Sequence, residues 1–455
     1  MSARTIDQHR DAVATLLAPL FRNRATEVLP LSSVWLTRDP DSYRQRTLAA
    51  DIDSPVALPP FDNSQMDGYA VRAHDLALAS AGSPVTLAVV ARIAAGDPAG
   101  DLGAGTVAPI MTGAPIPAGA DAVVPIEQTD PPRFLPQAPD GSTVPGQNVS
   151  FSAPVALGSF VRQTGSDVQT GDRLLAAGAR LGPAQYGVLA GTGVTTVTVL
   201  RRIRVLLVAT GHEIREAGDS LAPGQIFDSN SVILAQALQD AGCSVLVRPC
   251  RSDDAADLLA ILAEAPEVDL VVTVGGVSAG AREVVRDALE PLGVSFQHVA
   301  MQPGGPQGLG AISRSGTGVP APGDSTADEP AAVEPAPVST APASTVPVVT
   351  FPGNPVSALI SFEVFLRPVL RRLAGLPRPD RELRRAPLAA PVQSPAGKHQ
   401  LRRGILRPDG TLDLVGGASS HLLHAYATAT VLVHLPVGVG TVAAGEPVDY
   451  WSIDD

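Results

Sequence analysis

At 455 residues the chain is too long for one compact domain, and a scale of about 100 to 200 residues per domain predicts three or four domains. Aromatic residues make up only 4% of the sequence, so the cores must be built from small aliphatic side chains. The net charge of −12 excludes a nucleic-acid partner, because binding to a phosphate backbone needs a basic surface.

The N-terminal segment predicts a short helix, because apolar residues recur at helical spacing between Ile6 and Leu20. The first residues lack the apolar stretch and cleavage site of a signal peptide. No segment of the chain reaches the roughly 18 consecutive apolar residues that a transmembrane helix needs. We therefore expect a cytoplasmic protein without a membrane partner.

Residues 59–149 predict a small β-rich domain, in which short apolar runs alternate with Gly and Pro clusters. Within it, the segment PPFDNSQMDGYAV at Pro59 to Val71 reads by itself as a turn entering a strand. The segment from Ile110 to Gln128 places Thr112 and Gly113 on a tight loop. The hydroxyl and N–H groups of this loop can reach a phosphate, although such loops are usually structural.

A layered α/β unit is predicted from Arg202 onward. The runs IRVLLVAT, CSVLVRP, VDLVVTVGG and VPVVTF alternate with helical stretches. Their continuous apolar character is typical of strands that are covered on both faces. The only two cysteines, Cys243 and Cys250, are too few for a disulfide framework or a zinc finger, and a buried thiol is the ordinary interpretation.

Two helices of this unit carry end signals. Asp228 or Ser229 can cap the first helix at its start. The second, over residues 354–375, has Pro355 in the first helical position and is expected to kink at Pro368.

The last part of the chain has two further regions. Between Ser313 and Val346 the sequence is dominated by Pro, Ala, Ser, Thr and Gly, which cannot bury enough apolar surface to offset the chain entropy, so we predict a disordered surface insertion. From Pro379 to Asp455 short strands separated by Gly and Asp predict a C-terminal β-domain.

Three glycine-containing loops follow predicted strands of the α/β unit, at Thr210 to Glu213, at residues 275–278 and at residues 352–357. In open α/β sheets anions bind where strands run out into loops and helix N-termini, because unpaired N–H groups and the helix dipole favour negative charge there. Structural glycines account for each loop singly, but the three together favour a phosphate-bearing ligand. Lys398 is the only lysine, so arginine, backbone N–H groups or a metal ion must hold such a ligand.

Carboxylates accompany these loops, and clusters of hard oxygen ligands beside a phosphate suit Mg²⁺. The carboxylates are Asp62, Asp67, Asp167, Glu213, Asp228, Asp253 and Glu283. Each can instead cap a helix or lie in solvent, and for Asp228 that interpretation is as good as a functional one.

The order and spacing of the motifs resemble one known family. The segments FDNSQMDGYAV, MTGAPIPAGADAVVP, TGHEI, GQIFDSNS, GGVSAG and PGNPVSAL closely resemble the signature run of the molybdopterin molybdenumtransferases of the MoeA and gephyrin type. The resemblance covers essentially the whole chain, and the first and last of these segments are highly specific.

The resemblance implies an elongated, multidomain protomer of mixed α/β and β class. Its parts are a discontinuous helical linking region (1–50 and 149–198), a β-rich lobe (51–148), a molybdopterin-binding α/β domain with a parallel-rich sheet between helices (199–378, with the insertion at about 313–346), and a C-terminal β-barrel-like domain (379–455). It also implies a homodimer whose active site, at the subunit interface, combines the α/β domain of one protomer with the β-rich lobe and C-terminal domain of the other.

The implied reaction inserts molybdenum from molybdate into adenylylated molybdopterin (molybdopterin-AMP) with a divalent metal, Mg²⁺ or alternatively Zn²⁺, and releases AMP. A molybdopterin adenylyltransferase and apo-molybdoenzymes are implied as further partners. Carried over by motif, the catalytic residues are Asp62, Thr112, Glu213, Asp253 and Glu283, of which Glu213 and Asp253 hold the metal. The implied substrate-binding residues are Asp67, Asp167, Gly275, Gly276, Ser278, Pro352, Gly353, Asn354, Pro355 and Ser357.

The sequence departs from the family pattern at several positions. Gln302 and Gly305 stand where family members tend to carry lysine, His212 replaces an aspartate, and Glu283 replaces an aspartate with a longer carboxylate. A cationic contact to the phosphates is therefore missing. The side chains that can replace it are Arg282, Arg286 and His298.

Two other functions compete with the transferase. A molybdopterin adenylyltransferase shares the α/β domain and its glycine-rich loops, but it has no need of FDNSQMDGYAV or of the C-terminal β-domain. A gephyrin-like scaffold or pterin carrier without catalysis is the second alternative, and it leaves the retained Thr112, Glu213 and Asp253 without a chemical use. AMP release separates the two enzymes from the scaffold, and ATP dependence separates the enzymes from each other.

Overall fold

The computed structural model describes residues 3–22, 24–136, 138, 144–277, 283–313 and 345–453. The chain divides into two compact units, which are described separately: unit 1 is Met1–Glu27, Gln45–Thr47 and Leu200–Asp455, and unit 2 is Val28–Arg44 and Leu48–Val199. Residues 314–344 of the predicted insertion lie outside the described residues. Its predicted ends, Ser313 and Val346, belong to strands.

A six-stranded sheet forms the centre of unit 1. Its order is β18 (Cys243–Val247), β15 (Ile203–Ala209), β19 (Leu270–Val274), β23 (Thr345–Phe351), β22 (Pro306–Ser313) and β20 (Ser295–His298). The first four strands are parallel, β22 pairs antiparallel with β23, and β20 pairs antiparallel with β22. Val205, Leu206, Leu207 and Val208 are all buried, which confirms that the continuous apolar runs are strands covered on both faces.

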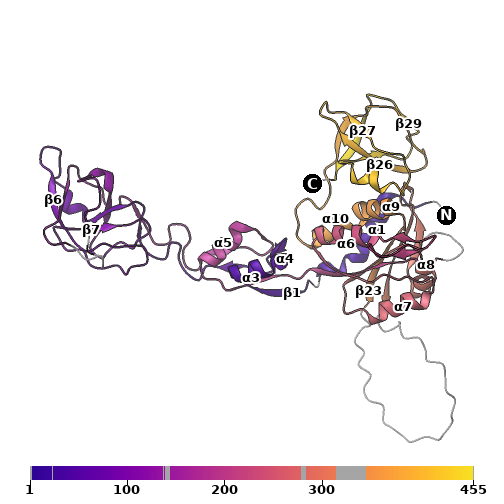
Figure 1. Cartoon of the computed structure of the whole chain (residues 1–455), viewed down its shortest axis with the longest axis horizontal. Coiled ribbons are helices and arrows are strands. Elements are labelled where there is room, and N and C mark those ends of the chain that lie inside the picture. The colour runs from indigo at the N-terminus through magenta and orange to yellow at the C-terminus, as the bar shows by residue number, and fades with distance from the viewer. Residues whose placement is uncertain are drawn as a thin grey trace, which may run out of the picture. The chain divides into compact units, whose positions relative to one another are not determined.

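Helices pack on both faces of this sheet (Figure 1). Against the face of Val205 and Leu207 lie α1 (Ile6–Leu17), α6 (Asn230–Asp240), α9 (Pro355–Ser361) and α10 (Arg367–Leu373). Against the face of Leu206 and Val208 lie α7 (Ala255–Glu264) and α8 (Val284–Leu289). The strand residues divide between the two groups of helices because successive residues of a strand point to opposite faces.

The two helices with predicted end signals are both present. The Asp228 carboxylate caps α6 by accepting hydrogen bonds from the Ser231 amide at 2.9 Å and from the Ser231 hydroxyl at 2.5 Å. The predicted 354–375 helix consists of α9 and α10, joined by a π-helical turn at Phe362–Leu366. This turn ends two residues before Pro368, which lacks the N–H of a regular helical hydrogen bond. The helix is therefore irregular near the position of the expected kink, and the irregularity is a π turn.

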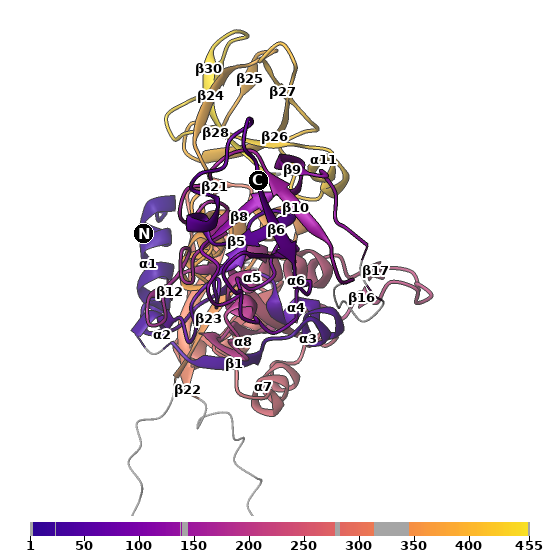
Figure 2. The same ribbon diagram turned by 90° about the vertical axis from the view of Figure 1, so that its left-hand side faces the viewer.

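A second sheet of unit 1 confirms the predicted C-terminal β-domain (Figure 2). It runs in the order β21 (Met301–Gln302), β26 (His399–Leu406), β28 (Val431–Leu435), β30 (Pro447–Ser452) and β24 (Arg384–Pro387), with β27 (Leu412–Leu414) paired to β26. Two short strands, β25 (Val392–Gln393) and β29 (Thr441–Val442), form a separate pair. The sheet is nearly closed and barrel-like, around a core that includes Leu412, Val433 and Leu435.

Unit 2 contains the predicted β-rich lobe. Its main sheet has the order β8 (Ala122–Pro125), β5 (Gly68–Val71), β7 (Thr106–Ile110), β6 (Val85–Val89), β10 (Asn148–Phe151) and β9 (Thr129–Asp130). Tyr69 and Phe151 are the largest side chains of its core. A separate core around Leu48, Leu189 and Val199 gathers the helical part, with α3 (Ser33–Arg38), α4 (Pro40–Tyr43) and α5 (Pro183–Gly191).

The start of the chain packs in unit 1. Residues 1–27 cluster with this unit. The reason is that α1 buries Val13 and Leu17 against the α/β sheet. No helix among the described residues is long and apolar enough to cross a membrane.

Candidate active site

The three glycine-containing loops predicted to bind an anion leave the α/β sheet side by side. Ala209, at the end of β15, pairs with Val274 of β19, and Val274 pairs with Phe351 of β23. Backbone hydrogen bonds extend this alignment past the strands: the Thr210 amide donates to Val274 at 3.0 Å, and the Gly275 amide donates to Phe351 at 3.0 Å. The loops that follow the three strands therefore begin at one edge of the sheet.

Glycine is required at this edge because the backbones approach one another closely. Gly275 has a φ of +101°, and a Cβ atom there would lie 2.7 Å from the Thr210 carbonyl oxygen. A Cβ on Gly353 would lie 3.3 Å from the Gly275 Cα atom. The glycines that the sequence analysis assigns to ligand binding thus also allow the loops to meet.

The close approach of the loops at Gly275 leaves no room for a side chain there. Gly275→Ala is expected to lower the free energy of unfolding by about 1–3 kcal/mol, because alanine resists a positive φ and its methyl group would meet a carbonyl oxygen. Urea unfolding measures the change. Gly397→Ala is the matched control, since Gly397 lies in the same unit with no atom near its Cβ position and no positive φ. Equal effects of the two substitutions would contradict the prediction.

Glu213 and Asp253 come together at the same edge, with His212 between them. Asp253 follows β18, and the Cys250 carbonyl in this loop accepts a hydrogen bond from the Gly211 amide at 3.1 Å. The His212 Nδ1 atom lies 2.9 Å from Asp253 Oδ2 and 3.8 Å from Glu213 Oε2. All three side chains are exposed. Among the described residues no group of three or more His, Cys, Asp or Glu side chains could hold a metal ion.

The remaining predicted residues of unit 1 flank this edge. The Gly353 carbonyl accepts a hydrogen bond from Asn230 Nδ2 at 2.7 Å. Asn354 is the N-cap residue of α9, and Pro355 begins the helix, as expected. The other predicted positions are Pro352 at the end of β23, Ser357 buried in α9, Gly276 with a φ of +58°, and Glu283 directly before α8. Ser278 lies outside the described residues.

Unit 2 holds the other predicted residues as two hydrogen-bonded pairs. Asp62 Oδ1 accepts bonds from the Thr164 amide and hydroxyl, both at 2.7 Å, and these bonds lower the pKa of the Asp62 carboxyl. Asp67 Oδ1 accepts bonds from the Thr112 amide at 2.7 Å and hydroxyl at 2.8 Å. Asp167 is exposed, and its amide donates to the Leu58 carbonyl at 3.0 Å.

Thr112 already has a hydrogen-bond partner within the protein. Its hydroxyl and N–H groups, which the loop can place near a phosphate, both donate to the Asp67 carboxylate, and a phosphate contact stays a prediction. The exposed pair therefore presents oxygen acceptors instead of donors. Oxygen acceptors suit the N–H and O–H groups of a ligand and repel a phosphate.

Two arginines that sequence reasoning missed lie in the C-terminal sheet. Arg402 and Arg403 of β26 are buried, and their Nη2 atoms donate to the carbonyls of Gly416, at 3.1 Å, and Gly417. No described carboxylate is within ion-pair distance of either, and burial lowers the pKa of both guanidinium groups. The loop they bind also contacts α9, because the Val356 amide donates to the Ser420 carbonyl at 3.2 Å.

A signal for these arginines was present in the segment LRRGIL. Successive residues of a strand face opposite sides, so two adjacent arginines in a β-domain cannot both face solvent if one side is packed. A cation without an acidic partner inside a domain is a candidate site for an anion.

The positions that depart from the family pattern have local partners. Gln302 Oε1 accepts a hydrogen bond from Gln400 Nε2 at 2.8 Å. A Cβ on Gly305 would lie 2.4 Å from the His298 ring, so His298 fills the space beside this position. Arg286 stacks on the Phe296 ring at 4.9 Å, and Arg282 lies outside the described residues. His298 is therefore the best placed of the three predicted substitutes, and its function stays a prediction.

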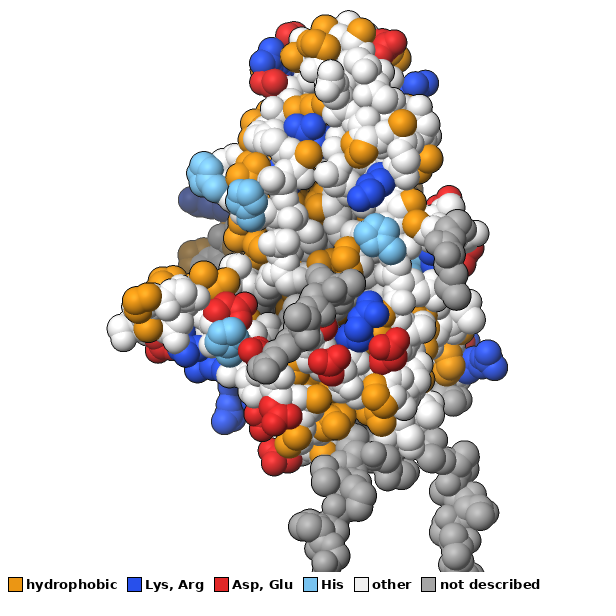
Figure 3. Space-filling view, turned by 90° about the vertical axis from the view of Figure 1, so that its right-hand side faces the viewer, with side chains coloured by type: hydrophobic (Ala, Val, Ile, Leu, Met, Phe, Trp, Pro, Cys, Tyr) orange, Lys and Arg blue, Asp and Glu red, His pale blue; other side chains and the backbone are white. Residues whose placement is uncertain are grey.

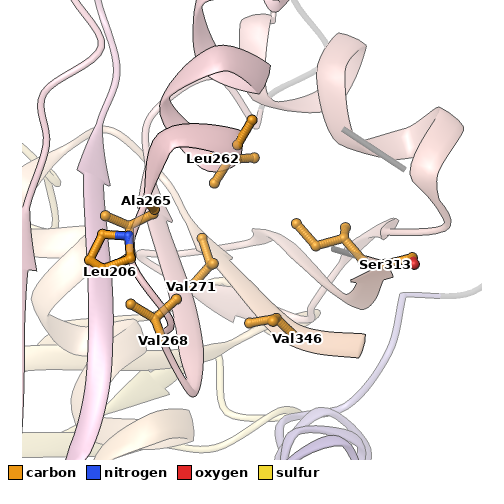
Figure 4. Close-up of a pocket in the computed structure, with 10 residues that line it drawn as sticks. Leu206, Leu262, Ala265, Val268, Val271, Ser313 and Val346 are labelled. Atoms are coloured by element: carbon orange, nitrogen blue, oxygen red, sulfur yellow. The ribbon is translucent and has the colours of Figure 1, made fainter. Parts of the chain in front are cut away.

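A pocket elsewhere in the α/β unit lacks the chemistry of an active site. It has a volume of about 110 Å³ and is lined by apolar side chains such as Leu206, Leu262 and Val271, with Ser313 at its edge (Figure 4). No charged side chain lines it. On the face shown in Figure 3, acidic and basic side chains are interspersed among the described residues.

Comparison with known proteins accounts for the order of these parts. The model of the MoeA N-terminal region (domain I and II) matches residues 4–193, the model of a probable molybdopterin binding domain matches residues 213–372, and the model of the MoeA C-terminal region (domain IV) matches residues 385–453.

Relatives agree over nearly the full length. The molybdopterin molybdenumtransferase 2 of Mycobacterium tuberculosis is 42% identical, over 89% of this chain and 92% of that protein. The molybdopterin molybdenumtransferase of Synechococcus elongatus is 34% identical, over 90% and 92%. The crystal structure of a molybdopterin biosynthesis MoeA protein from Pyrococcus horikoshii superposes with a TM-score of 0.72 at 28% identity and covers 99% of both chains. The chain therefore belongs to the MoeA family of molybdopterin molybdenumtransferases, which are enzymes of molybdenum cofactor biosynthesis.

Proposed function

We propose that this chain transfers molybdenum from molybdate to adenylylated molybdopterin and releases AMP together with the molybdenum cofactor. The observation that carries the proposal is the convergence of three glycine loops beside Glu213 and Asp253 at one edge of the α/β sheet. Such an edge attracts a phosphate-bearing ligand, and the two carboxylates lie where a cation on that phosphate is needed.

The donor set of this edge fits Mg²⁺ better than Zn²⁺. Glu213 and Asp253 supply hard carboxylate oxygens, which Mg²⁺ combines with water and substrate phosphate. A structural zinc site would instead close with four nitrogen or sulfur ligands. When bound, the cation neutralises charge that develops on the departing AMP phosphate. The protein's own part is to hold the two carboxylates and keep the phosphoanhydride against the glycine loops.

Arg402 and Arg403 are our candidates for holding an oxyanion, either molybdate or a substrate phosphate. Neither forms an ion pair with a described carboxylate, and the chain has a single lysine, Lys398, so the cation that holds an anion has to come from arginine. Their loop reaches the start of α9 through the bond from Val356 to Ser420. This arrangement supports a contribution of the C-terminal domain to the site.

Asp67 and Thr112 are proposed to bind donor groups of the pterin or the adenosine. Asp67→Asn is expected to raise the KM for adenylylated molybdopterin about tenfold with little change in kcat, because a hydrogen bond to a charged group contributes about 1.5–3 kcal/mol. Steady-state kinetics check this prediction. Asp130→Asn, an exposed carboxylate of the same unit, is the control. A fall in kcat at unchanged KM would assign the pair to catalysis.

The assay that tests the function is molybdate-dependent AMP release from adenylylated molybdopterin by the purified protein with Mg²⁺. Release that depends on molybdate supports the transferase. Turnover that depends on ATP would identify an adenylyltransferase, and pterin binding without release would identify a carrier or scaffold. A homodimer with a site shared between protomers is part of the proposal, and sedimentation equilibrium tests it.

A further inference from the structure

A second cavity of unit 1 lies between α6, the π-helical turn, α10 and α11 (Leu423–Ala427). Its volume is about 530 Å³, within the range of small-molecule sites, which is roughly 300–1,000 Å³. Apolar side chains form most of its wall, among them Ile233, Leu359, Phe362, Tyr426 and Ile453. None of its lining residues is among the candidate active-site residues. We call it the α6–α10 cavity.

A buried carboxylate in this cavity is paired with one of three arginines. Glu363 accepts hydrogen bonds from Arg381 Nε at 2.7 Å and Nη2 at 3.2 Å, an arrangement in which both carboxylate oxygens are bound. Arg381 Nη1 also donates to the Ser452 carbonyl at 2.7 Å. Arg381 and Glu363 thus neutralise each other and tie the π turn to the end of β30.

Arg367 is the second arginine beside Glu363, and Glu363 binds it less closely than it binds Arg381. Its Nε atom lies 3.6 Å from Glu363 Oε2, which is too far for a good hydrogen bond, and its Nη1 atom donates to the Pro379 carbonyl at 3.0 Å. Among the described residues, Nη2 has no acceptor. The side chain is only 7% exposed, and burial together with the neighbouring Arg381 lowers the pKa of Arg367 to about 10. The charged form is therefore short of a counter-ion.

The cavity as a whole carries an excess of positive charge. Arg367, Arg371 and Arg381 line it with two carboxylates, Glu363 and Asp240. The Arg371 donors bind the carbonyls of Asp240, at 3.2 Å, and Pro377, at 2.7 Å, so its charge is held near the cavity. A buried cation favours any anion that can reach it, because the low dielectric strengthens their attraction.

The π-helical turn gives this arrangement its geometry. It spans Phe362–Leu366, so Glu363 lies inside the turn and Arg367 directly after it. π turns are rare and are frequently found at functional sites. Here the turn coincides with the cavity and with the Arg367 guanidinium group.

We propose that the α6–α10 cavity binds a small organic anion, a carboxylate or phosphate on an apolar body, with the anionic group on Arg367. The apolar body lies against the walls from α9, the π turn and α11. This ligand site goes beyond the molybdenum transfer proposed above and does not depend on it.

Probe ligands on the intact protein test the proposal. Phenyl phosphate and benzoate are expected to raise the Tm by about 2–4 °C at ten times their Kd, because ligand binding to the folded state alone contributes about 1.4 kcal/mol there. Benzyl alcohol, which lacks the charge, and inorganic phosphate, which lacks the apolar body, are expected to give no comparable shift. Absence of a shift with both organic anions overturns the proposal, and an equal shift with inorganic phosphate overturns the role of the apolar wall.

Variants locate the site. Arg367→Met is expected to lose the response to both organic anions, and Arg407→Met, which removes an exposed arginine paired with Asp413, is expected to keep it. Ala237→Phe fills the cavity from α6 while leaving the arginines in place, so it tests the site even if Arg367→Met fails to fold. An unchanged response in Ala237→Phe overturns the location. All of these measurements are independent of AMP release.

Discussion

Glu213→Gln is expected to lower AMP release from adenylylated molybdopterin by at least about 100-fold while leaving binding of the pterin measurable. The carboxylate lies beside Asp253 at the edge where the three glycine loops begin, and glutamine keeps its size but removes its charge. In the proposed mechanism, loss of that charge weakens binding of the divalent cation beside the phosphoanhydride, whereas contacts to the rest of the substrate remain. AMP release and pterin fluorescence titration measure the two effects separately.

The matched control for this substitution lies on the same loop. Glu216→Gln removes a carboxylate three residues away whose side chain is 80% exposed and whose Arg251 partner is at 3.8 Å. We expect nearly unchanged turnover in this variant. If Glu213→Gln also turns over at the normal rate, the assignment of Glu213 is wrong. Asp253→Asn is expected to lower AMP release as much as Glu213→Gln does. The double variant should lower AMP release little further, because both carboxylates are proposed to hold one cation.

Acidification from pH 7.5 to pH 5.0 is expected to lower the free energy of unfolding of unit 1 by about 4 kcal/mol. Two buried histidines account for this. His9 is fully buried against Phe365, and burial, aided by Arg4, lowers its pKa to about 4. His434 packs against Trp451, and burial, together with His399 and Arg10, lowers its pKa to about 3.

The direction follows from proton binding. Both folded-state pKa values lie below the ordinary histidine value of 6.5, so below pH 6.5 the unfolded chain binds protons that the folded chain excludes. Their full contribution is present above pH 6.5 and is lost as the pH falls towards 4. pH 5.0 lies about 1.5 units below the unfolded-state pKa of histidine. At this pH each buried histidine therefore lowers the free energy of unfolding by about 2 kcal/mol.

Fluorescence of Trp451 reports this unfolding. The chain has two tryptophans, so a Trp35→Phe background leaves Trp451 as the only one. In that background His9→Phe is expected to reduce the pH dependence by about half, and His424→Gln, on the exposed surface of α11, is expected to leave it unchanged. A pH dependence that survives in His9→Phe and in His434→Gln would place its origin in other groups.

Several features of this protein follow from the sequence by itself. Runs such as those at 203–209 and 270–274 predict buried parallel strands, because uninterrupted apolar residues suit a strand covered on both faces. Asp228 and Pro355 mark helix starts, because capping and a fixed proline φ are local properties. The specific strings FDNSQMDGYAV and PGNPVSAL identify the family for the same reason, since each is contiguous.

Other features were decided only by the tertiary structure. The Thr112 donors bind Asp67, 45 residues away, so carboxylate oxygens are exposed beside this loop. Arg402 and Arg403 are buried without a described carboxylate partner, and Arg367 lies 3.6 Å from Glu363 because Arg381, a residue on a separate segment, binds both Glu363 oxygens more closely. The position of α1 in unit 1 depends on Val13 and Leu17 meeting the sheet. In each case the partner is distant in sequence, and periodicity or a local motif carries no information about such a partner.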